Sequence, residues 1–340
     1  MRRVLAPIWP NAVWSFGKLE LNDFSICIPA ERTDVRFGEG VYVKIPKRRS
    51  QTRSIDQIDE ADQRFGGSEA ASLTALAEAW PIGDGVRYVE MLGHIEERNV
   101  LVTRRVYGED FSVRLRRLDF TGRLKHRKAD QDAVEALRRV GRSLASFHRA
   151  TRREGGPTTK VLMAKFGRYG GRLREFGVAE ESISRILQIA SPWMVEDTPG
   201  FAAGALTLKG LDVRNLLAEP EGRLVFLDPG ALKVDSPLAD HARFSATIRL
   251  LYWGKLAFFL GMYPRAEYMD AFDQGYFGGQ RPSASKIYEL KELCKMWLMA
   301  HAALRGKPWP RLLKSALRAT YIDRFFTSWI AELEREPRNG

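Results

Sequence analysis

The sequence predicts an α+β protein in two parts, a small antiparallel sheet followed by a mainly helical region. The chain has 340 residues, more than one compact core usually supports. Residues 1–106 contain mainly short β-rich runs, whereas after Gly108 the apolar residues recur with the helical period. We therefore expect a first domain over 1–106 and a second over 107–340.

The first part is predicted to contain several strands and one helix. Apolar runs separated by polar turns predict strands over 12–21, 24–28, 40–45, 88–95 and 99–106. Residues 47–66 are polar and poorly periodic, which predicts a loop or a short exposed helix. Ser68 has the character of an N-cap, so we expect a helix over 69–79 that ends before Pro81.

The second part is predicted to be helical with one interruption. Apolar residues between Asp132 and Arg149 recur at the spacing of a core-facing stripe. Further helices are expected over 180–190, 236–260, 264–275 and 283–335. The interruption is a hairpin, in which 211–217 and 224–228 flank the turn 219–222.

Composition excludes several classes of protein. Hydrophobic residues make up 44% and charged residues 28%, which is typical of a globular chain and not of a disordered or collagen-like one. The two cysteines, Cys27 and Cys294, are too far apart for a disulfide framework or a zinc knuckle. The N-terminus lacks the apolar run of an export signal, and the apolar stretch 250–263 is too short to span a bilayer. We expect a cytoplasmic protein, with peripheral association at a membrane left open.

The positive charge is concentrated in one segment. The chain has a net charge of +12, and residues 104–174 alone hold 20 Lys and Arg against 7 Asp and Glu. Such a segment could attract an anionic ligand or a membrane surface, or it could be a solvated helix face. Nucleic acid is an unlikely partner, because no recognised nucleic-acid motif accompanies the charge. The oligomeric state is not predicted.

Four polar residues stand in an order that suggests phosphoryl transfer. Lys44 lies among apolar neighbours in the strand 41–45, and Glu69 at the start of the following helix could pair with it. Asn215 and Asp228, thirteen residues apart, flank the predicted hairpin. Their oxygens are ligands suited to Mg²⁺, which is usually held by one or two carboxylates plus substrate phosphates. A phosphate-binding lysine and a metal-binding pair are the apparatus of phosphoryl transfer.

In this order the motifs resemble the small-molecule branch of the protein-kinase-like superfamily: aminoglycoside phosphotransferases, choline kinases and lipopolysaccharide-core sugar kinases. Lys44 resembles the strand lysine, Glu69 the helix glutamate, and Leu227-Asp228-Pro229-Gly230 the metal-binding motif. Residues 100–109 resemble the hinge that binds adenine through its backbone, which implies Thr103, Arg105 and Val106 as nucleotide contacts. Residues 237–243 resemble the helix start that follows. The resemblance covers roughly 35–275 and implies a bilobal kinase-like fold that uses ATP and Mg²⁺.

One departure from the family pattern concerns catalysis. The family places an aspartate five residues before the asparagine, where this chain has Gly210. Asp212 is the nearest carboxylate, and we expect it to act as the catalytic residue if the protein transfers phosphate. Loss of a general base lowers a rate by about 10²–10⁴-fold without abolishing the chemistry. The phosphate-covering glycine motif is also poorly marked, with Gly38-Glu39-Gly40 as its one candidate.

Two functions therefore remain open. The first is an ATP- and Mg²⁺-dependent phosphotransferase acting on a hydroxyl of a small polar acceptor, such as a sugar, a glycolipid or an aminoglycoside-like compound. The basic segment argues against a polycationic acceptor and toward an anionic one. The second is a pseudokinase, a nucleotide-binding regulatory or scaffold module with little transfer activity.

Overall fold

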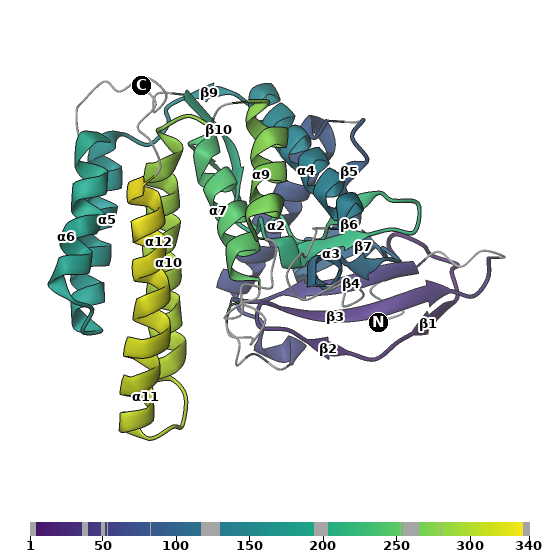
Figure 1. The fold of residues 1–340 in the computed structure, drawn as a ribbon. Helices are drawn as coiled ribbons and strands as arrows, with labels where there is room; N and C mark the ends of the chain where they lie inside the picture. Colours follow the sequence, from purple (N-terminus) through teal and green to yellow (C-terminus); the bar gives the residue numbers. More distant parts are fainter. Residues whose placement is uncertain are drawn as a thin grey trace, which may run out of the picture.

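The computed structural model describes residues 5–35, 40–48, 52, 54–81, 83–116, 130–193, 203–251, 253, 265–279 and 281–335. An antiparallel sheet formed by the N-terminal strands lies beside a larger region that contains most of the helices (Figure 1). The α+β fold class is confirmed. The division into 1–106 and 107–340 stays a prediction.

The N-terminal sheet carries the predicted lysine. Its strands are β1 (Trp14–Phe16), β2 (Glu20–Leu21), β3 (Ser25–Arg32), β4 (Gly40–Pro46), β6 (Met91–Ile95) and β7 (Val100–Arg104). They run antiparallel in the order β1-β3-β4-β7-β6, with β2 paired to β3. In β4 the alternation of the backbone buries Val41, Val43 and Ile45, and it places Tyr42 and Lys44 on the other face.

Two of the predicted strands are broken in the structure. The run 12–21 divides into β1 and β2, with Gly17 between them packed against Pro29. The run 88–95 divides because β5 (Val86–Tyr88) pairs in parallel with β12 (Leu224–Phe226) in a different sheet. Tyr88 stacks on Phe226 with a ring separation of 5.2 Å, so burial of aromatic surface accompanies the exchange of partner strand.

The helix that carries Glu69 is longer than predicted. α2 (Glu60–Ala79) begins nine residues before the expected start, at a capping box formed by Asp59 and Asp62. Within this extra length Gly66 packs against Asn99, and a Cβ at position 66 would lie 1.9 Å from the Asn99 Oδ1 atom. Of the two expectations for 47–66, a loop or a short exposed helix, residues 60–66 are helical and belong to α2, because Gly66 permits close packing against Asn99 and does not end the helix.

Two small sheets belong to the second half. One has the order β5-β12-β11-β8, with β8 (Glu109–Asp110) and β11 (Leu216–Ala218). β11 and β12 form the predicted antiparallel hairpin. The other has the order β13-β10-β9, formed by β9 (Arg153–Glu154), β10 (Ala203–Leu208) and β13 (Leu232–Asp235). The sequence patterns did not predict these three strands.

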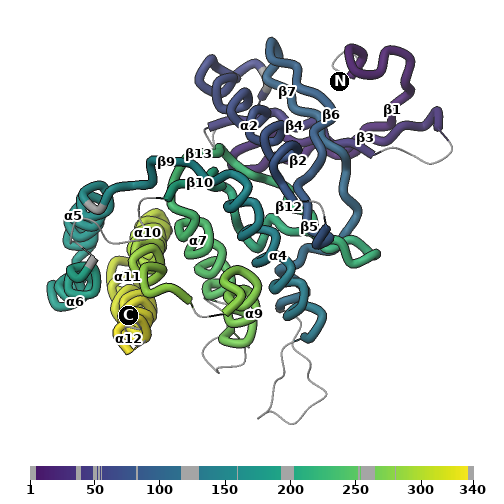
Figure 2. The backbone as a smooth tube through the Cα atoms, turned by 90° about the horizontal axis from the view of Figure 1, so that it is seen from above, coloured from purple at the N-terminus to yellow at the C-terminus, as the bar shows by residue number. Residues whose placement is uncertain are grey.

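The helices form two groups (Figure 2). The described α-helices after α2 are α3 (Phe111–Arg116), α4 (Gln131–Ala150), α5 (Thr159–Glu175), α6 (Glu180–Ala190), α7 (Pro237–Leu250), α9 (Arg265–Phe277), α10 (Ser285–Arg305), α11 (Arg311–Leu317) and α12 (Arg324–Arg335). A π-helical turn, Arg318–Asp323, joins α11 to α12. Short 3₁₀ turns occupy Ile55–Gln57, Glu96–Arg98, Ser191–Trp193 and Val213–Asn215. α4, α7 and α9 stand in the centre, and α5, α6, α10, α11 and α12 lie together on one side.

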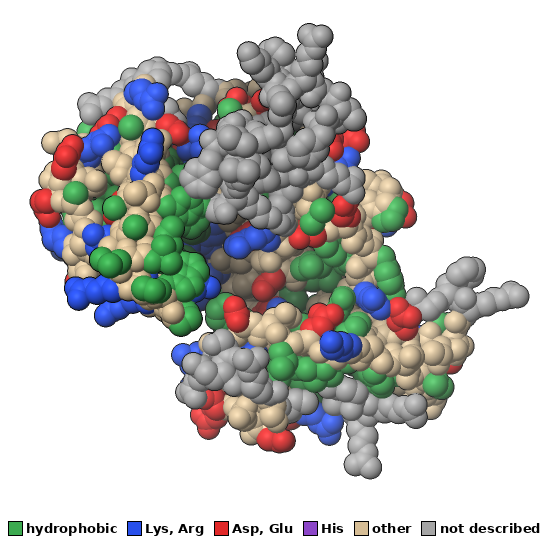
Figure 3. All heavy atoms as spheres, turned by 60° about the horizontal axis from the view of Figure 1, so that its bottom comes forward, with side chains coloured by type: hydrophobic (Ala, Val, Ile, Leu, Met, Phe, Trp, Pro, Cys, Tyr) green, Lys and Arg blue, Asp and Glu red, His purple; other side chains and the backbone are tan. Residues whose placement is uncertain are grey.

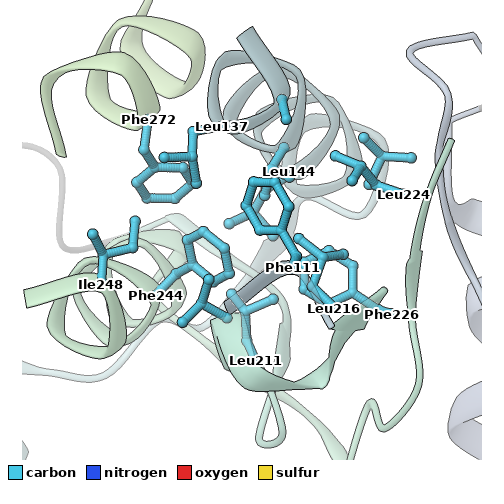
Figure 4. Packing of buried hydrophobic residues seen from close by; sticks show 14 of the residues in the cluster. Phe111, Leu137, Leu144, Leu211, Leu216, Leu224, Phe226, Phe244, Ile248 and Phe272 are labelled. Atoms are coloured by element: carbon cyan, nitrogen blue, oxygen red, sulfur yellow. The ribbon is translucent and has the colours of Figure 1, made fainter. Parts of the chain in front are cut away.

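The central core supports the loop that carries Asn215. Phe111, Leu137, Leu144, Leu216 and Phe226 converge between α4 and the small sheets (Figure 4). The predicted helix over 236–260 is seen as α7, which is described to Leu250 and is followed by Leu251. Residues 252 and 254–264, which include most of the apolar stretch 250–263, lie outside the described residues. No helix among the described residues has the length and apolar character needed to span a bilayer.

Candidate nucleotide and phosphoryl-transfer site

Lys44, Glu69 and Asp228 meet between the two halves of the chain. The Lys44 Nζ atom donates to Glu69 Oε1 as an ion pair and lies 3.7 Å from Asp228 Oδ2. The Lys44 side chain is 15% exposed and that of Glu69 is 5% exposed. The expectation that strand lysine, helix glutamate and loop aspartate share one cleft is confirmed.

The charges of this cluster are coupled. Burial alone would lower the pKa of the Lys44 ammonium, but the Asp228 and Glu69 carboxylates outweigh it, so that pKa is raised. Burial raises the pKa of Glu69 despite the opposing effect of Lys44. Lys44 is therefore held as a cation, with its charge directed between the two carboxylates.

α2 is also held in place from the second half. The Leu232 backbone N–H, in β13, donates to the Ser72 hydroxyl on α2 over 3.0 Å. The same hydroxyl donates to the Ser68 carbonyl, so both of its functions are used. Because β13 follows the Asp228 loop, this bond couples the position of Glu69 to that of the loop.

Asn215 and Asp228 are brought to adjacent strand ends. The Leu227 N–H donates to the Asn215 carbonyl over 2.9 Å, and the Asp228 Oδ1 atom accepts from the Gly230 N–H over 3.0 Å. The Asn215 amide nitrogen donates to the Gly210 carbonyl, which leaves its side-chain oxygen as a ligand. The described residues contain no group of three metal-binding His, Cys, Asp or Glu side chains. Two hard oxygens nevertheless fit Mg²⁺, which keeps several waters and bridges to substrate phosphates.

A cavity of about 640 Å³ adjoins Lys44 and Asp228. It is lined by Glu20, Asn22, Ser25, Cys27, Tyr42, Lys44, Val89, residues 103–108, Asp110, Leu217, Leu227 and Asp228. The space-filling view shows a hollow between the two halves, with acidic and basic side chains on its walls (Figure 3). Thr103, Arg105 and Val106 lie on the cavity wall, and their role as nucleotide contacts stays a prediction. The Arg105 N–H already donates to the Gly40 carbonyl, so its carbonyl is the backbone group it can offer.

The cover over this cavity comes from a segment that sequence reasoning missed. Glu20, Asn22, Ser25 and Cys27 line the cavity and belong to the β2–β3 hairpin and the adjoining part of β3. Gly38 and Glu39 lie outside the described residues, and Gly40 packs under Tyr107 at the hinge. Alternation along β3, which puts Ser25 and Cys27 on one face, is the signal that could have indicated this hairpin.

The loop before Asn215 is built from backbone contacts. The Gly210 N–H donates to the Pro229 carbonyl over 2.9 Å. A Cβ at position 210 would lie 2.5 Å from the Asp228 carbonyl oxygen and 2.9 Å from the Gly230 nitrogen. The family position for the catalytic aspartate is thus closed to any side chain in this arrangement, because real Cβ contacts are never so short.

Asp212 takes part in a local ion pair. Its Oδ1 atom accepts from both the backbone N–H and the Nε atom of Arg214, each over 2.9 Å, and it caps the 3₁₀ turn Val213–Asn215. The pair raises the pKa of the Arg214 guanidinium. The Arg214 side chain is 68% exposed and that of Asp212 is 19% exposed, and two guanidinium contacts make the pair bidentate.

A buried network supports the start of this loop. Asp240 accepts from the Leu208 N–H over 2.8 Å and contacts His148 Nε2 at 3.2 Å. Arg243 donates to the carbonyls of Leu208 and Lys209. His148 also contacts the Tyr276 hydroxyl, so both of its ring nitrogens have partners in the core.

Three lysines from distant segments lie near one another beside β13. Lys233 in β13 forms an ion pair with Asp235. Burial lowers the pKa of the Lys291 ammonium on α10, and the balance of Lys165 and Lys233 against Glu292 and Asp235 leaves that pKa at about 8. Cations from α5, β13 and α10 are therefore close to one another, with the Asp235 and Glu292 carboxylates among them.

Several arginines of the basic segment 104–174 form ion pairs where the segment is described, partly with carboxylates outside it. Pairs join Arg104 to Glu90, Arg105 to Glu31, Arg114 to Asp132, Arg142 to Glu135 and Arg174 to Glu180. Residues 117–129 lie outside the described residues. An anionic ligand or membrane surface at this segment stays a prediction.

No protein-family model and no curated protein matches the chain significantly. Solved structures are similar to it over nearly their whole length. A thermostable mutant of aminoglycoside phosphotransferase APH(4)-Ia, in complex with AMP-PNP and hygromycin B, has a TM-score of 0.56 at 14% identity, with 99% of each chain covered. A choline/ethanolamine kinase family protein from Mesorhizobium loti has a TM-score of 0.54 at 16% identity, covering 99% of this chain and 94% of that one.

A third structure widens the range of acceptors among these neighbours. Macrolide 2'-phosphotransferase MphH from Brachybacterium faecium has a TM-score of 0.51 at 14% identity, covering 94% of this chain and 97% of that one. At such low identity the likeness concerns the fold. The chain therefore has the protein-kinase-like fold of small-molecule kinases, as the order of its motifs predicted.

Proposed function

We propose that the protein is an ATP- and Mg²⁺-dependent phosphotransferase that acts on a hydroxyl of a small, polar, anionic acceptor. The observation that carries this proposal is the assembled cluster of Lys44, Glu69 and Asp228 beside a cavity of about 640 Å³. Phosphoryl transfer depends mainly on positioning and on neutralisation of charge. The cluster supplies a fixed cation for phosphate oxygens and a carboxylate for the metal.

The position of this cluster indicates roles for the other residues of the site. The backbone of 103–106 would bind the base, and Asn215 with Asp228 would hold Mg²⁺, which when bound neutralises charge on the transferred group. The β2–β3 hairpin would exclude water from above the phosphates. Asp212 would accept the acceptor hydroxyl's hydrogen bond after Arg214 turns away, which requires this bidentate ion pair to open.

The acceptor class is argued from the charges beside the loop. Lys165, Lys233 and Lys291 come from α5, β13 and α10, and the Asp235 and Glu292 carboxylates approach two of them. Cations at this place favour an acceptor that carries phosphate, carboxylate or sulfate over a polycationic one. A sugar or glycolipid with an acidic group therefore fits these lysines better than an aminoglycoside.

Nucleotide binding can be measured at the cleft itself. Cys27 lines the cavity, whereas Cys294 is fully buried with a raised thiol pKa, so alkylation reports on Cys27. Burial also raises the pKa of the Cys27 thiol, and its alkylation should therefore accelerate as the pH rises. Saturating ATP with Mg²⁺ is expected to slow this reaction at least tenfold, to raise the melting temperature, and to be turned over in the presence of an anionic acceptor.

The control variants distinguish loss of the nucleotide site from loss of the folded structure. Lys44→Ala should remove the protection of Cys27; because it also leaves the buried Glu69 carboxylate without its cation, circular dichroism must show that the variant is folded. Arg64→Ala, at an exposed cation on α2, should bind like the unaltered protein. Protection that persists in Lys44→Ala would contradict the assignment, and no protection by any nucleotide would exclude both nucleotide-binding functions.

A pseudokinase is the second candidate, and Gly210 is the observation that favours it. The position of the family's base carries no side chain, and the close contact with residues 228–230 leaves no room for one. Protection of Cys27 by ATP without turnover of any acceptor would identify this function.

Asp212→Asn separates the two candidates. If Asp212 orients the acceptor, this change should lower turnover by about 10²–10⁴-fold with nucleotide affinity nearly unchanged. Arg214→Ala is the matched variant, since it removes the ion pair but keeps the carboxylate, and it should retain turnover. If both variants lower the melting temperature equally and neither changes turnover, Asp212 is only a cap and the phosphotransferase assignment of this residue is wrong.

A further inference from the structure

The end of α10 and the short helix α11 form an apolar surface far from the cleft. We define the α10–α11 tip as residues 299–318. Its large exposed apolar side chains are Met299, Trp309, Leu312 and Leu313, and Leu312 is 86% exposed. Four such side chains within fifteen residues make a patch, whereas scattered single exposures need no explanation.

The charge of the tip has one sign. Its basic residues are Arg305, Lys307, Arg311, Lys314 and Arg318, and residues 299–318 contain no Asp or Glu. Among the described residues, no carboxylate forms an ion pair with Arg305, Lys307, Arg311 or Lys314. Lys314 donates to the Arg305 carbonyl and Arg318 to the Phe176 carbonyl, which orders these side chains without neutralising them.

The cations line a pocket. A cavity of about 230 Å³ is bounded by Glu175, Phe176, His301, Leu304, Arg305, Arg311, Lys314, Ser315 and Arg318. Four basic residues thus line the pocket with one acidic residue, and among the described residues only Arg318 of the four approaches a further carboxylate, that of Asp323, at 3.8 Å. A pocket with this excess of positive charge would take a phosphate-sized anion.

The apolar and basic features belong to one end of the molecule. α11 lies at the free end of the group formed by α10 and α12, away from the sheets (Figure 1). Tryptophan and leucine beside Lys and Arg are the composition that enters the boundary between lipid headgroups and acyl chains. A neutral protein partner would cover the apolar side chains but leave the basic pocket unmatched.

We propose that the α10–α11 tip binds the surface of an anionic lipid membrane, with a headgroup phosphate in the basic pocket and with Trp309 and Leu312 in the interfacial layer. Attraction between the tip and the surface falls off within a Debye length and is weakened by salt. This inference concerns binding alone and does not depend on the proposed transfer reaction.

Vesicle sedimentation tests the proposal with the full-length protein. Vesicles of phosphatidylcholine with 30% phosphatidylglycerol are expected to bind it at least tenfold better than pure phosphatidylcholine at about 0.1 M salt, and less at about 0.5 M. Arg305→Glu with Arg311→Glu should reduce this binding at least tenfold. Trp309→Ala with Leu312→Ser should also reduce it, and the remaining binding should become more sensitive to salt.

Matched variants keep the result interpretable. Arg64→Glu with Arg98→Glu changes the net charge equally at exposed positions elsewhere and should bind like the unaltered protein, as should Val13→Ser. Circular dichroism confirms that each variant is folded. Equal loss in the Arg64/Arg98 variant, no binding to anionic vesicles, or equal binding of free glycerol phosphate and vesicles would each overturn the proposal. A sedimentation equilibrium that shows a dimer dissolved by Leu312→Ser would instead assign the tip to a second copy of the chain.

Discussion

Asp228→Asn is expected to abolish the metal-dependent part of nucleotide binding and to lower turnover by about 10³-fold or more. A bound metal ion supplies several kcal/mol of charge stabilisation in the transition state, and each 1.36 kcal/mol corresponds to a factor of ten. The amide keeps the shape of the side chain but removes the charge that faces Lys44 at 3.7 Å. Titration of Mg²⁺ at fixed ATP, followed by protection of Cys27 from alkylation, measures the change.

The fold should survive this substitution. Lys44 keeps Glu69 as its partner, and the Asp228 side chain is 42% exposed, so little buried charge is left unpaired. Glu221→Gln, which removes a carboxylate from the exposed turn between β11 and β12, is the control and should retain the Mg²⁺ requirement. An unchanged Mg²⁺ dependence in Asp228→Asn would remove this residue from the metal site.

Gly210→Asp is expected to destabilise the protein and to restore no activity, although it recreates the family's residue. Its Cβ would approach the Asp228 carbonyl oxygen to 2.5 Å and the Gly230 nitrogen to 2.9 Å, and both are backbone atoms that cannot turn away. Overpacking of this kind costs about 1–3 kcal/mol. The loop that presents Asp228 would have to move, so nucleotide affinity should fall together with the melting temperature.

Two alanine variants isolate the steric effect. Gly210→Ala adds the same Cβ without a charge and should be destabilised in a similar way. Gly171→Ala, in α5 with nothing within 4 Å of the added Cβ, should be neutral or stabilising by about 0.5–1 kcal/mol, because alanine is the better helix former. A rise in turnover of Gly210→Asp would show that position 210 admits a working base, and it would overturn our description of this loop.

Much of the candidate site could be predicted because its residues lie in locally recognisable patterns. Lys44 sits in an alternating strand and Asp228 ends an apolar one, so their surroundings follow from neighbours within a few residues. The spacing of Asn215 and Asp228 reflects a hairpin, which is also a local structure. The buried face of α4 could be predicted for the same reason, since the residues of one helix face recur every three or four positions.

Other features depended on contacts between distant segments. The role of Gly66 depends on its contact with Asn99, which is distant in the sequence. The division of 88–95 depends on the pairing of β5 with β12. The β2–β3 hairpin lines the cavity only because other segments of the chain fold against it. The local sequence pattern does not contain this information. Composition located the positive charge in 104–174, but the structure pairs several of those arginines with carboxylates inside and outside the segment.

The sequence by itself determined which chemical groups the protein carries and in which order: a strand lysine, a helix glutamate, an asparagine and an aspartate, with no base at position 210. Only the tertiary structure decided that backbone atoms close position 210, that lysines from three separated segments lie near one another, and that the α10–α11 tip is exposed and basic. The physical reason is that hydrogen bonding and apolar periodicity act between near neighbours and leave their trace in the sequence. Steric closure and summed charge arise only when remote segments are packed together.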